Sequence, residues 1–245
     1  MTLTEALLEI ARSDERGVLF TVLDGDRRGS KLLVRLDRAD RLGDGPTTLE
    51  PLATQLRRSG IVEHEGARVF ADVFGPPPLL VVVGAVDVGE ALCAGARTLG
   101  WHTICVDPRA RFATPDRVPS AERIVVAWPG EALAQIGLDH DTALVALTHD
   151  EKFDVPALAA ALRSDAFYVA ALGSRVAQES RRERLREVGA TEEELERLHG
   201  PAGLDIGAES PAETAVSVLA EALAVRAGRR GGPLRESASR IHAER

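Results

Sequence analysis

Beyond residue 78 the chain alternates short apolar runs with segments of helical spacing, and this alternation limits the folds open to it. The first run, residues 79–83, is continuously apolar, as expected of a parallel strand covered on both faces. Further apolar runs follow at 103–106, 124–127, 143–147 and 168–171, most of them separated by helical segments. Successive strand-to-helix crossovers of this kind predict an α/β fold with a doubly wound, parallel, Rossmann-like sheet.

The run Gly75-Pro76-Pro77-Pro78 predicts a domain boundary, because consecutive prolines join neither a helix interior nor a sheet ladder. Before it, apolar spacing predicts a helix over 3–11, strands at 18–23, 31–36 and 68–74, and a second helix over 49–58. We therefore expect a small α+β domain over 1–77 and a Rossmann-like domain over 78–228. Residues 229–245 are rich in Arg, Gly and Ser and predict a flexible tail.

Helix-capping signals and the pattern of charges predict further features of the second domain. Thr191 with Glu194, and Ser210 with Glu213, fit capping boxes and predict helices beginning near 192 and 211. Between 179 and 197, arginines alternate with glutamates at helical spacings, which predicts a solvated helix face.

Composition excludes several classes of protein. The two cysteines, Cys93 and Cys105, form no C-x-x-C pair, so we expect no metal site and interpret both as buried core thiols. A net charge of −8 argues against nonspecific nucleic-acid binding. No apolar run approaches about 20 residues, and the N-terminus carries Glu5 rather than the positive charge of a signal peptide. We therefore expect a cytoplasmic protein without a membrane span.

In a doubly wound sheet, ligands bind outside the carboxyl ends of the strands, where the strand order reverses. This topology predicts that the loops following four of the strands converge on one site. The candidate ligand-binding residues in these loops are Gly84, Asp107, Arg109, Thr148, His149, Gly173, Ser174 and Arg175.

The first of these loops, Gly84 to Gly89, differs from the dinucleotide fingerprint Gly-x-Gly-x-x-Gly, because Val86 occupies the middle glycine position. Asp107 lies 23 residues after Gly84, near the place of a ribose-binding acid, and it is equally well interpreted as a turn residue before Pro108. NAD(P) binding is therefore one alternative, opposed chiefly by Val86.

Two other loops carry candidate chemistry. Gly173, Ser174 and Arg175 combine a tight strand exit, a helix cap and a positive charge, which suits a phosphate and equally describes a simple capped helix. His149 is a candidate general base, oriented by Asp150 or Asp154, or else a structural residue at a strand end.

Five strings along the chain carry a family resemblance: Val106-Asp107-Pro108-Arg109, Leu147-Thr148-His149-Asp150, Lys152-Phe153-Asp154, Ala171-Leu172-Gly173-Ser174-Arg175 and His199-Gly200-Pro201-Ala202-Gly203-Leu204-Asp205-Ile206-Gly207-Ala208. In this order and spacing they resemble the C-terminal Rossmann domain of the XdhC/CoxI family, over about residues 79–228. The N-terminal segment resembles the family more weakly, mainly at 29–34. The resemblance adds Asp205 to the candidate ligand-binding residues.

Members of this family are accessory factors for molybdenum hydroxylases such as xanthine dehydrogenase. The resemblance implies a non-catalytic maturation factor that binds molybdenum cofactor (molybdopterin) and helps to insert it into an apo-enzyme. Implied partners are that molybdenum hydroxylase and a cysteine desulfurase as sulfur source. A homodimer is a further expectation, because a two-domain carrier can form its crevice between subunits.

Two stretches differ from the family pattern. The family's N-terminal domain usually carries Gly-Gly-Cys-Val-Glu, whereas the corresponding stretch here, Gly43-Asp44-Gly45-Pro46-Thr47, has no thiol. The family's first Rossmann loop commonly reads Gly-Ala-Gly, where this chain has Gly84-Ala85-Val86. The alternatives to cofactor delivery are an NAD(P)-dependent oxidoreductase that uses the same crevice, and a scaffold that binds partner proteins without a ligand.

Overall fold

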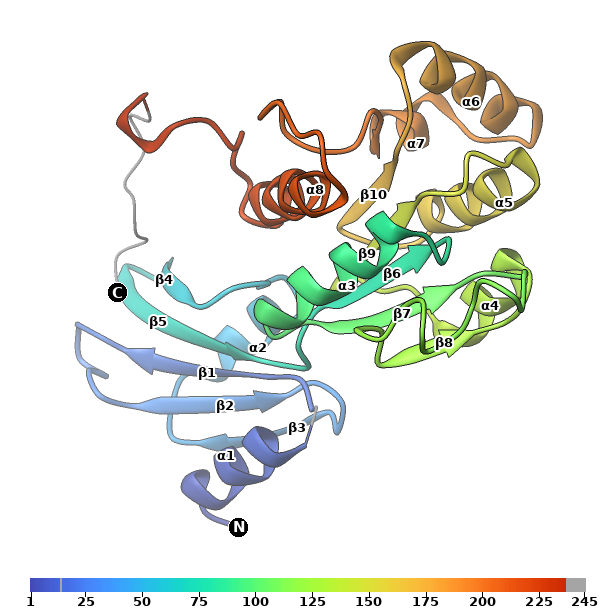
Figure 1. Cartoon of the computed structure of the whole chain (residues 1–245). Coiled ribbons are helices and arrows are strands. Elements are labelled where there is room, and N and C mark those ends of the chain that lie inside the picture. The colour runs from blue at the N-terminus through green and yellow to red at the C-terminus, as the bar shows by residue number, and fades with distance from the viewer. Residues whose placement is uncertain (14, 237–245) are drawn as a thin grey trace. The chain divides into compact units, whose positions relative to one another are not determined.

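The computed structural model describes residues 1–13 and 15–236, and the chain divides into two compact units (Figure 1). Unit 1 comprises Met1–Pro76 together with the described residues from Pro233 onward, and unit 2 comprises Pro77–Gly232. The division falls within the proline run. Of the tail expected over 229–245, residues 237–245 lie outside the described residues.

Unit 1 is an antiparallel sheet with the strand order β3-β2-β1-β5-β4. Its strands are β1 (Gly17–Val22), β2 (Lys31–Arg35), β3 (Asp40–Gly43), β4 (Gly60–His64) and β5 (Ala67–Phe74). Helix α1 (Leu3–Arg12) begins at a capping box made by Thr2 and Glu5. Ile10 of α1 packs with Leu33 of β2, whereas Phe20 and Leu32 belong to a separate core cluster that includes Ala53 at the end of α2 (Glu50–Ala53).

The structure of unit 1 differs from the sequence prediction in one helix and in two additional strands. The helix expected over 49–58 is only a 3-10 turn (Thr47–Leu49) followed by the single turn of α2 (Glu50–Ala53), because the chain has to turn into β4 at Gly60. Strands β3 and β4 were not predicted, because both are edge strands and lack a regular apolar alternation.

Unit 2 contains a six-stranded parallel sheet with the order β11-β10-β9-β6-β7-β8. The strands are β6 (Leu79–Val83), β7 (His102–Val106), β8 (Arg123–Val125), β9 (Thr142–Ala146), β10 (Tyr168–Ala171) and β11 (Leu198–His199). Numbered from β6, this is the Rossmann order 3-2-1-4-5-6, so the predicted doubly wound parallel sheet is confirmed. The two-residue strand β11 was not predicted.

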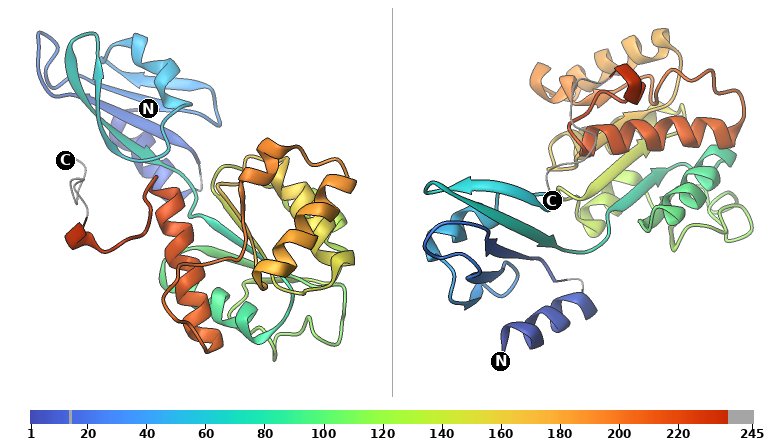
Figure 2. Two further views of the ribbon diagram at one scale, coloured as in Figure 1. Left: turned by 90° about the horizontal axis from the view of Figure 1, so that it is seen from above. Right: turned by 90° about the vertical axis from the view of Figure 1, so that its left-hand side faces the viewer.

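Helices cover both faces of this sheet, as Figure 2 shows. One face packs on α3 (Asp87–Thr98) and α8 (Pro211–Arg226), which also contact each other. The other face packs on α4 (Pro129–Ile136), α5 (Glu151–Leu162), α6 (Arg175–Glu187) and α7 (Glu192–Glu196). The capping boxes predicted for α7 and α8 are confirmed. None of the described helices is long and apolar enough to cross a membrane.

The strand order reverses between β6 and β9, which are neighbours in the sheet. Helix α3 follows β6 onto one face and α5 follows β9 onto the other, so the two connecting loops diverge from a common edge. At the base of this divergence the backbones come very close. Gly84 has φ +121°, and a Cβ atom there would lie 2.9 Å from Cγ2 of Thr148. In open α/β sheets this edge, at the reversal of strand order, is where a ligand is expected.

Candidate functional site

The carboxyl edge of the parallel sheet brings together most of the residues predicted from the sequence. Gly84 follows β6, Asp107 follows β7, Thr148 closely follows β9 and Gly173 closely follows β10. Asp205 lies instead on an exposed part of the segment between β11 and α8.

The loop from β6 to α3 keeps two of the three fingerprint glycines. A Cβ atom at Gly89 would lie 2.6 Å from the carbonyl oxygen of Gly84, so this glycine permits the close packing of helix on strand. Val86 is the N-cap residue of α3 and forms no side-chain cap, and Asp87 and Glu90 stand in the first helical turn. These carboxylates oppose an anion at this helix end.

Asp107 is fully buried, and its carboxylate accepts four hydrogen bonds. The backbone amides of Ala85 and Arg109 donate two of them at 2.9 Å, and the Arg109 guanidinium donates the others from Nε at 2.9 Å and Nη2 at 2.8 Å. Burial alone raises the pKa of Asp107, but these hydrogen bonds outweigh it and hold the pKa below its ordinary value. Because a carboxylate offers about four acceptor positions, none remains for a ribose hydroxyl.

The buried ion pair of Asp154 and Arg181 fixes the side chain of Thr148. Its hydroxyl donates to Oδ1 of Asp154 at 2.6 Å, and Oδ2 of Asp154 lies 3.3 Å from Nη2 of Arg181 on α6. Nη1 of Arg181 donates to Oε1 of Gln178 at 2.6 Å. Arg181 is only 7% exposed, so the expectation of a solvated face over 179–197 was wrong at this residue. The spacing of Gln178, Arg181 and Leu185 on one helix face was the available signal.

His149 is exposed and has φ +55°, a left-handed conformation that is uncommon for a non-glycine residue. Its ring approaches Gly173, where a Cβ atom would lie 3.6 Å from Cε1 of His149. Asp150, expected to orient His149, instead caps α5 by accepting a hydrogen bond from the Lys152 amide at 3.0 Å. A pocket of about 160 Å³ adjoins this loop. It is lined by His149, Glu151, Asp154, Val155, Ala177, Ser180 and Arg181.

The N-terminus of α6 differs from the other helix N-termini at this edge. Gly173 has φ +133°, Ser174 caps the helix by accepting from the Ala177 amide at 3.2 Å, and Arg175 is exposed. No acidic residue stands in the first turn of α6, whereas acidic residues stand in the first turns of α3 and α5. Of these three helix ends, α6 is therefore the one whose charge suits an anion.

The segment that follows β11 is anchored by Glu221 of α8, a residue that the sequence did not single out. Glu221 accepts hydrogen bonds from the Tyr168 hydroxyl at 2.5 Å and from the Gly203 amide at 2.7 Å, and it lies 3.3 Å from Nδ1 of His199. Burial raises its pKa, but hydrogen bonds from His199, Tyr168 and Gly203 bring the pKa below its ordinary value. Residues 199–204 are thereby fixed beside the strand ends.

The strand order and the helices on both faces of the sheet define a Rossmann-type unit. Comparison with known families is more specific: the XdhC Rossmann domain matches residues 80–222, and the chain belongs to this family. The family membership predicted from the five strings is confirmed.

Three curated relatives match parts of the chain. The uncharacterized protein YqeB of Escherichia coli is 33% identical over 67% of the chain, and a probable xanthine dehydrogenase subunit of Bacillus subtilis is 30% identical over 64%. The molybdenum cofactor insertion chaperone PaoD of Escherichia coli is 39% identical over 40% of the chain. The matches span 30%, 46% and 30% of these relatives, respectively.

The whole chain also resembles a solved structure. A crystal structure described as a xanthine dehydrogenase from Bacillus halodurans matches 97% of this chain and 98% of its own, with a TM-score of 0.56 and 17% sequence identity. At this identity the match shows that the fold is shared.

Proposed function

We propose that the protein is an accessory factor that binds molybdenum cofactor and assists its maturation and its insertion into a molybdenum hydroxylase of the xanthine dehydrogenase class. The XdhC Rossmann domain and the names of two relatives, one a cofactor insertion chaperone and one a probable xanthine dehydrogenase subunit, support this function. The cofactor is cargo in this proposal, and the chain acts by holding and releasing it.

The N-terminus of α6 is the observation that carries the proposal. Molybdopterin bears a phosphate group, and α6 offers first-turn amides, the Ser174 cap and the exposed Arg175 without an opposing carboxylate in its first turn. The fit is chemical, because the first-turn amides and the Arg175 guanidinium are donors that suit a phosphate dianion.

The cysteines limit what the chain does to its cargo. Cys93 and Cys105 are both buried, and burial raises the pKa of each thiol. Neither therefore supplies an exposed thiolate to carry sulfur. In our proposal a separate cysteine desulfurase delivers the sulfur, and this chain binds the cofactor before and after that step.

The test is retention of molybdopterin by the purified protein, measured by equilibrium binding. Arg175→Ala should weaken binding, because the charge nearest the α6 N-terminus is removed. Arg123→Ala is the matched control: it removes an exposed arginine at the start of β8, on the opposite edge of the sheet, and should leave binding unchanged. Absence of binding by the unsubstituted protein, or equal effects of the two substitutions, would contradict the proposal.

The alternative function, an NAD(P)-dependent oxidoreductase, is favoured by the Rossmann strand order. It is opposed by Val86 and by Asp107, whose carboxylate already accepts four hydrogen bonds within the protein. A bound cofactor at 100 times its dissociation constant would stabilise the protein by about 2.7 kcal/mol. We expect NAD⁺ and NADP⁺ to stabilise it no more than AMP does in a thermal-shift measurement. A scaffold without a ligand would instead capture the apo-enzyme while binding no molybdopterin.

A further inference from the structure

Arginine and aromatic side chains alternate at the carboxyl edge of the parallel sheet, and none of them lines the pocket of about 160 Å³. The order is Arg111, Phe112, Arg109, Phe153 and Trp128, which we call the arginine–aromatic ladder. Cζ of Arg111 lies 4.8 Å from the Phe112 ring centroid, and Cζ of Arg109 lies 4.5 Å from Phe112 and 5.6 Å from Phe153. The ring centroids of Phe153 and Trp128 are 5.3 Å apart, and the two rings lie edge to face.

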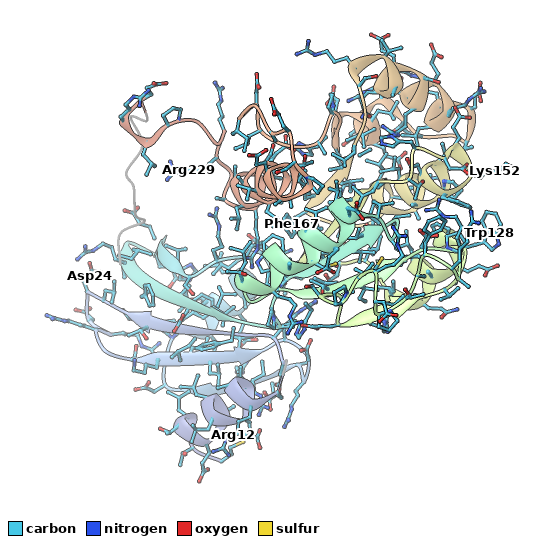
Figure 3. All side chains as sticks on the ribbon, in the orientation of Figure 1. Arg12, Asp24, Trp128, Lys152, Phe167 and Arg229 are labelled. Atoms are coloured by element: carbon cyan, nitrogen blue, oxygen red, sulfur yellow. The ribbon has the colours of Figure 1, made fainter. Side chains whose placement is uncertain are left out.

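The ladder is built from three separate segments of the carboxyl edge. Arg109, Arg111 and Phe112 lie in the connection between β7 and β8, Trp128 is the N-cap residue of α4, and Phe153 stands in the first turn of α5. Figure 3 shows the labelled side chains of Trp128 and Lys152 at the same edge of the unit. The ladder is therefore a tertiary arrangement rather than a local motif.

Trp128 is exposed at the end of the ladder. It is 51% exposed, and among the residues that the structure describes it is the one exposed Phe, Tyr or Trp side chain. The buried Phe153 supports one side of the indole, so the ring is held in place while part of its surface faces solvent. A supported, exposed indole of this kind is suited to stack on a flat ring.

Cationic groups flank this ring. Arg109 uses Nε and Nη2 for Asp107, which leaves the N–H groups of Nη1 directed elsewhere. Arg111 and Lys152 are exposed and form no ion pair within residues 1–13 and 15–236. Four acids stand near these cations and the indole. Asp107 is neutralised by Arg109, Asp150 caps α5, Glu151 in the first turn of α5 pairs with Arg184, and Glu131 stands in the first turn of α4.

We propose that the arginine–aromatic ladder binds a planar heteroaromatic ring joined to a phosphate, the chemistry of a nucleotide. The ring stacks on Trp128, and the phosphate is held by Nη1 of Arg109 and the ammonium group of Lys152, with Arg111 adding positive charge. Stacking on an aromatic side chain and pairing of phosphate with guanidinium are the two interactions by which such groups are commonly held. This subsite is additional to the phosphate position proposed at α6.

The experiment uses the emission of the protein's own tryptophans, with AMP as the probe and adenosine and inorganic phosphate as its separate halves. The second tryptophan, Trp101, is only 4% exposed and packs edge-on against Phe167, so it provides a constant background. We expect AMP to quench emission saturably and adenosine to bind more weakly. Phosphate alone should leave emission unchanged, and Trp101→Phe should retain the AMP response.

Equilibrium dialysis of AMP then tests the named residues. Trp128→Leu should weaken binding about tenfold, because a stacked ring is lost, and Lys152→Ala should weaken it by a smaller factor. Both side chains are exposed, so thermal unfolding of the two variants should stay close to that of the unsubstituted protein, and Arg123→Ala should bind AMP normally. A lack of saturable quenching by AMP, or binding that Trp128→Leu leaves intact, would overturn the proposal.

Arg175→Ala separates this subsite from the proposed cofactor function. It should bind AMP normally while losing affinity for molybdopterin. Loss of AMP binding in Arg175→Ala would overturn the separate subsite, whereas failure to bind molybdopterin with normal AMP binding would count against the cofactor function alone.

Discussion

The carboxylate of Asp107 and the guanidinium of Arg109 face each other as a two-pronged pair, with Arg109 Nε–Asp107 Oδ1 and Arg109 Nη2–Asp107 Oδ2 distances of 2.9 and 2.8 Å. The pair occupies the place where a nucleotide-binding Rossmann domain usually presents a free acid. In this protein the Asp107 carboxylate instead binds groups of the same chain. It accepts a hydrogen bond from the Ala85 amide just after β6, and it orients Arg109 toward two phenylalanine rings.

Replacing Arg109 should destabilise unit 2 in a pH-dependent way. Arg109→Gln leaves the buried Asp107 carboxylate short of donors, which should lower the free energy of unfolding by about 2 kcal/mol at neutral pH. Because the folded-state pKa of Asp107 is depressed, this contribution is present above the unfolded-state pKa of about 4 and is lost as the pH falls toward the folded-state value. Urea unfolding across this pH range measures it.

The control for Arg109→Gln is Arg111→Gln, which alters an exposed arginine on the same loop. Its effect should stay within about 0.5 kcal/mol. A difference between Arg109→Gln and the unsubstituted protein that stays constant from neutral to acidic pH would contradict the assigned pairing.

The close approach of Gly84 to Thr148 should make Gly84 intolerant of a side chain. Gly84→Ala adds a Cβ atom 2.9 Å from Cγ2 of Thr148 at φ +121°, and we expect a loss of about 2 kcal/mol in denaturant unfolding. Gly100→Ala, also at positive φ but with open space around it, should cost about 1 kcal/mol. Thr148→Ser removes the clashing methyl group and should partly rescue Gly84→Ala; additive effects would argue against the contact.

The anion preference of the α6 N-terminus can be separated from helix stability by adding a charge. Val176 lies in the first turn of α6 and is 74% exposed. Val176→Asp should leave the unfolding free energy unchanged or raise it by less than about 1 kcal/mol, since an acid near a helix N-terminus is favourable. The same carboxylate should weaken molybdopterin binding, and Val176→Asn is the neutral control. Equal binding by both variants would place the phosphate elsewhere.

The two cysteines should be inert in the folded protein. Burial raises the pKa of Cys93 and brings that of Cys105 to about 12, so neither forms thiolate near neutral pH. We expect Ellman's reagent to titrate no thiol in the native state and both thiols after unfolding. Rapid reaction of either thiol in the native protein would reopen a sulfur-carrying role.

The strands could be predicted where they are buried on both faces, because such burial requires apolar residues. Strands β6, β7, β9 and β10 lie inside a sheet covered on both faces, so their sequences are almost continuously apolar and were recognised. Strands β3, β4 and β11 lie at sheet edges, where one side lacks a neighbouring strand, and no apolar pattern marks them. The length of helix α2 was overestimated because residues at helical spacing continue beyond its last turn.

The site could be predicted only as a set of strand ends. Topology alone puts Gly84, Asp107 and Gly173 at one edge. Their supporting contacts join residues far apart in the chain: Asp154 and Arg181 are 27 positions apart, and Tyr168 and Glu221 are 53 apart. No local spacing encodes such pairs, so Glu221 could not be found from the sequence. The helical spacing of Arg181 with Gln178 and Leu185 indicated its burial but not its partner Asp154.

The packing of α8 against α3 has a consequence for the folding of unit 2 during its synthesis. The apolar face formed by β6, β7, β9 and β10 is closed jointly by α3, near the start of the unit, and by α8, near its end. Ribosomal synthesis supplies α8 last. Until Ala215, Val218, Leu219 and Ala222 have emerged, the part of that face on which α8 packs has no cover. The nascent unit must therefore carry an exposed apolar surface through most of its translation, a state in which chaperones typically engage a chain.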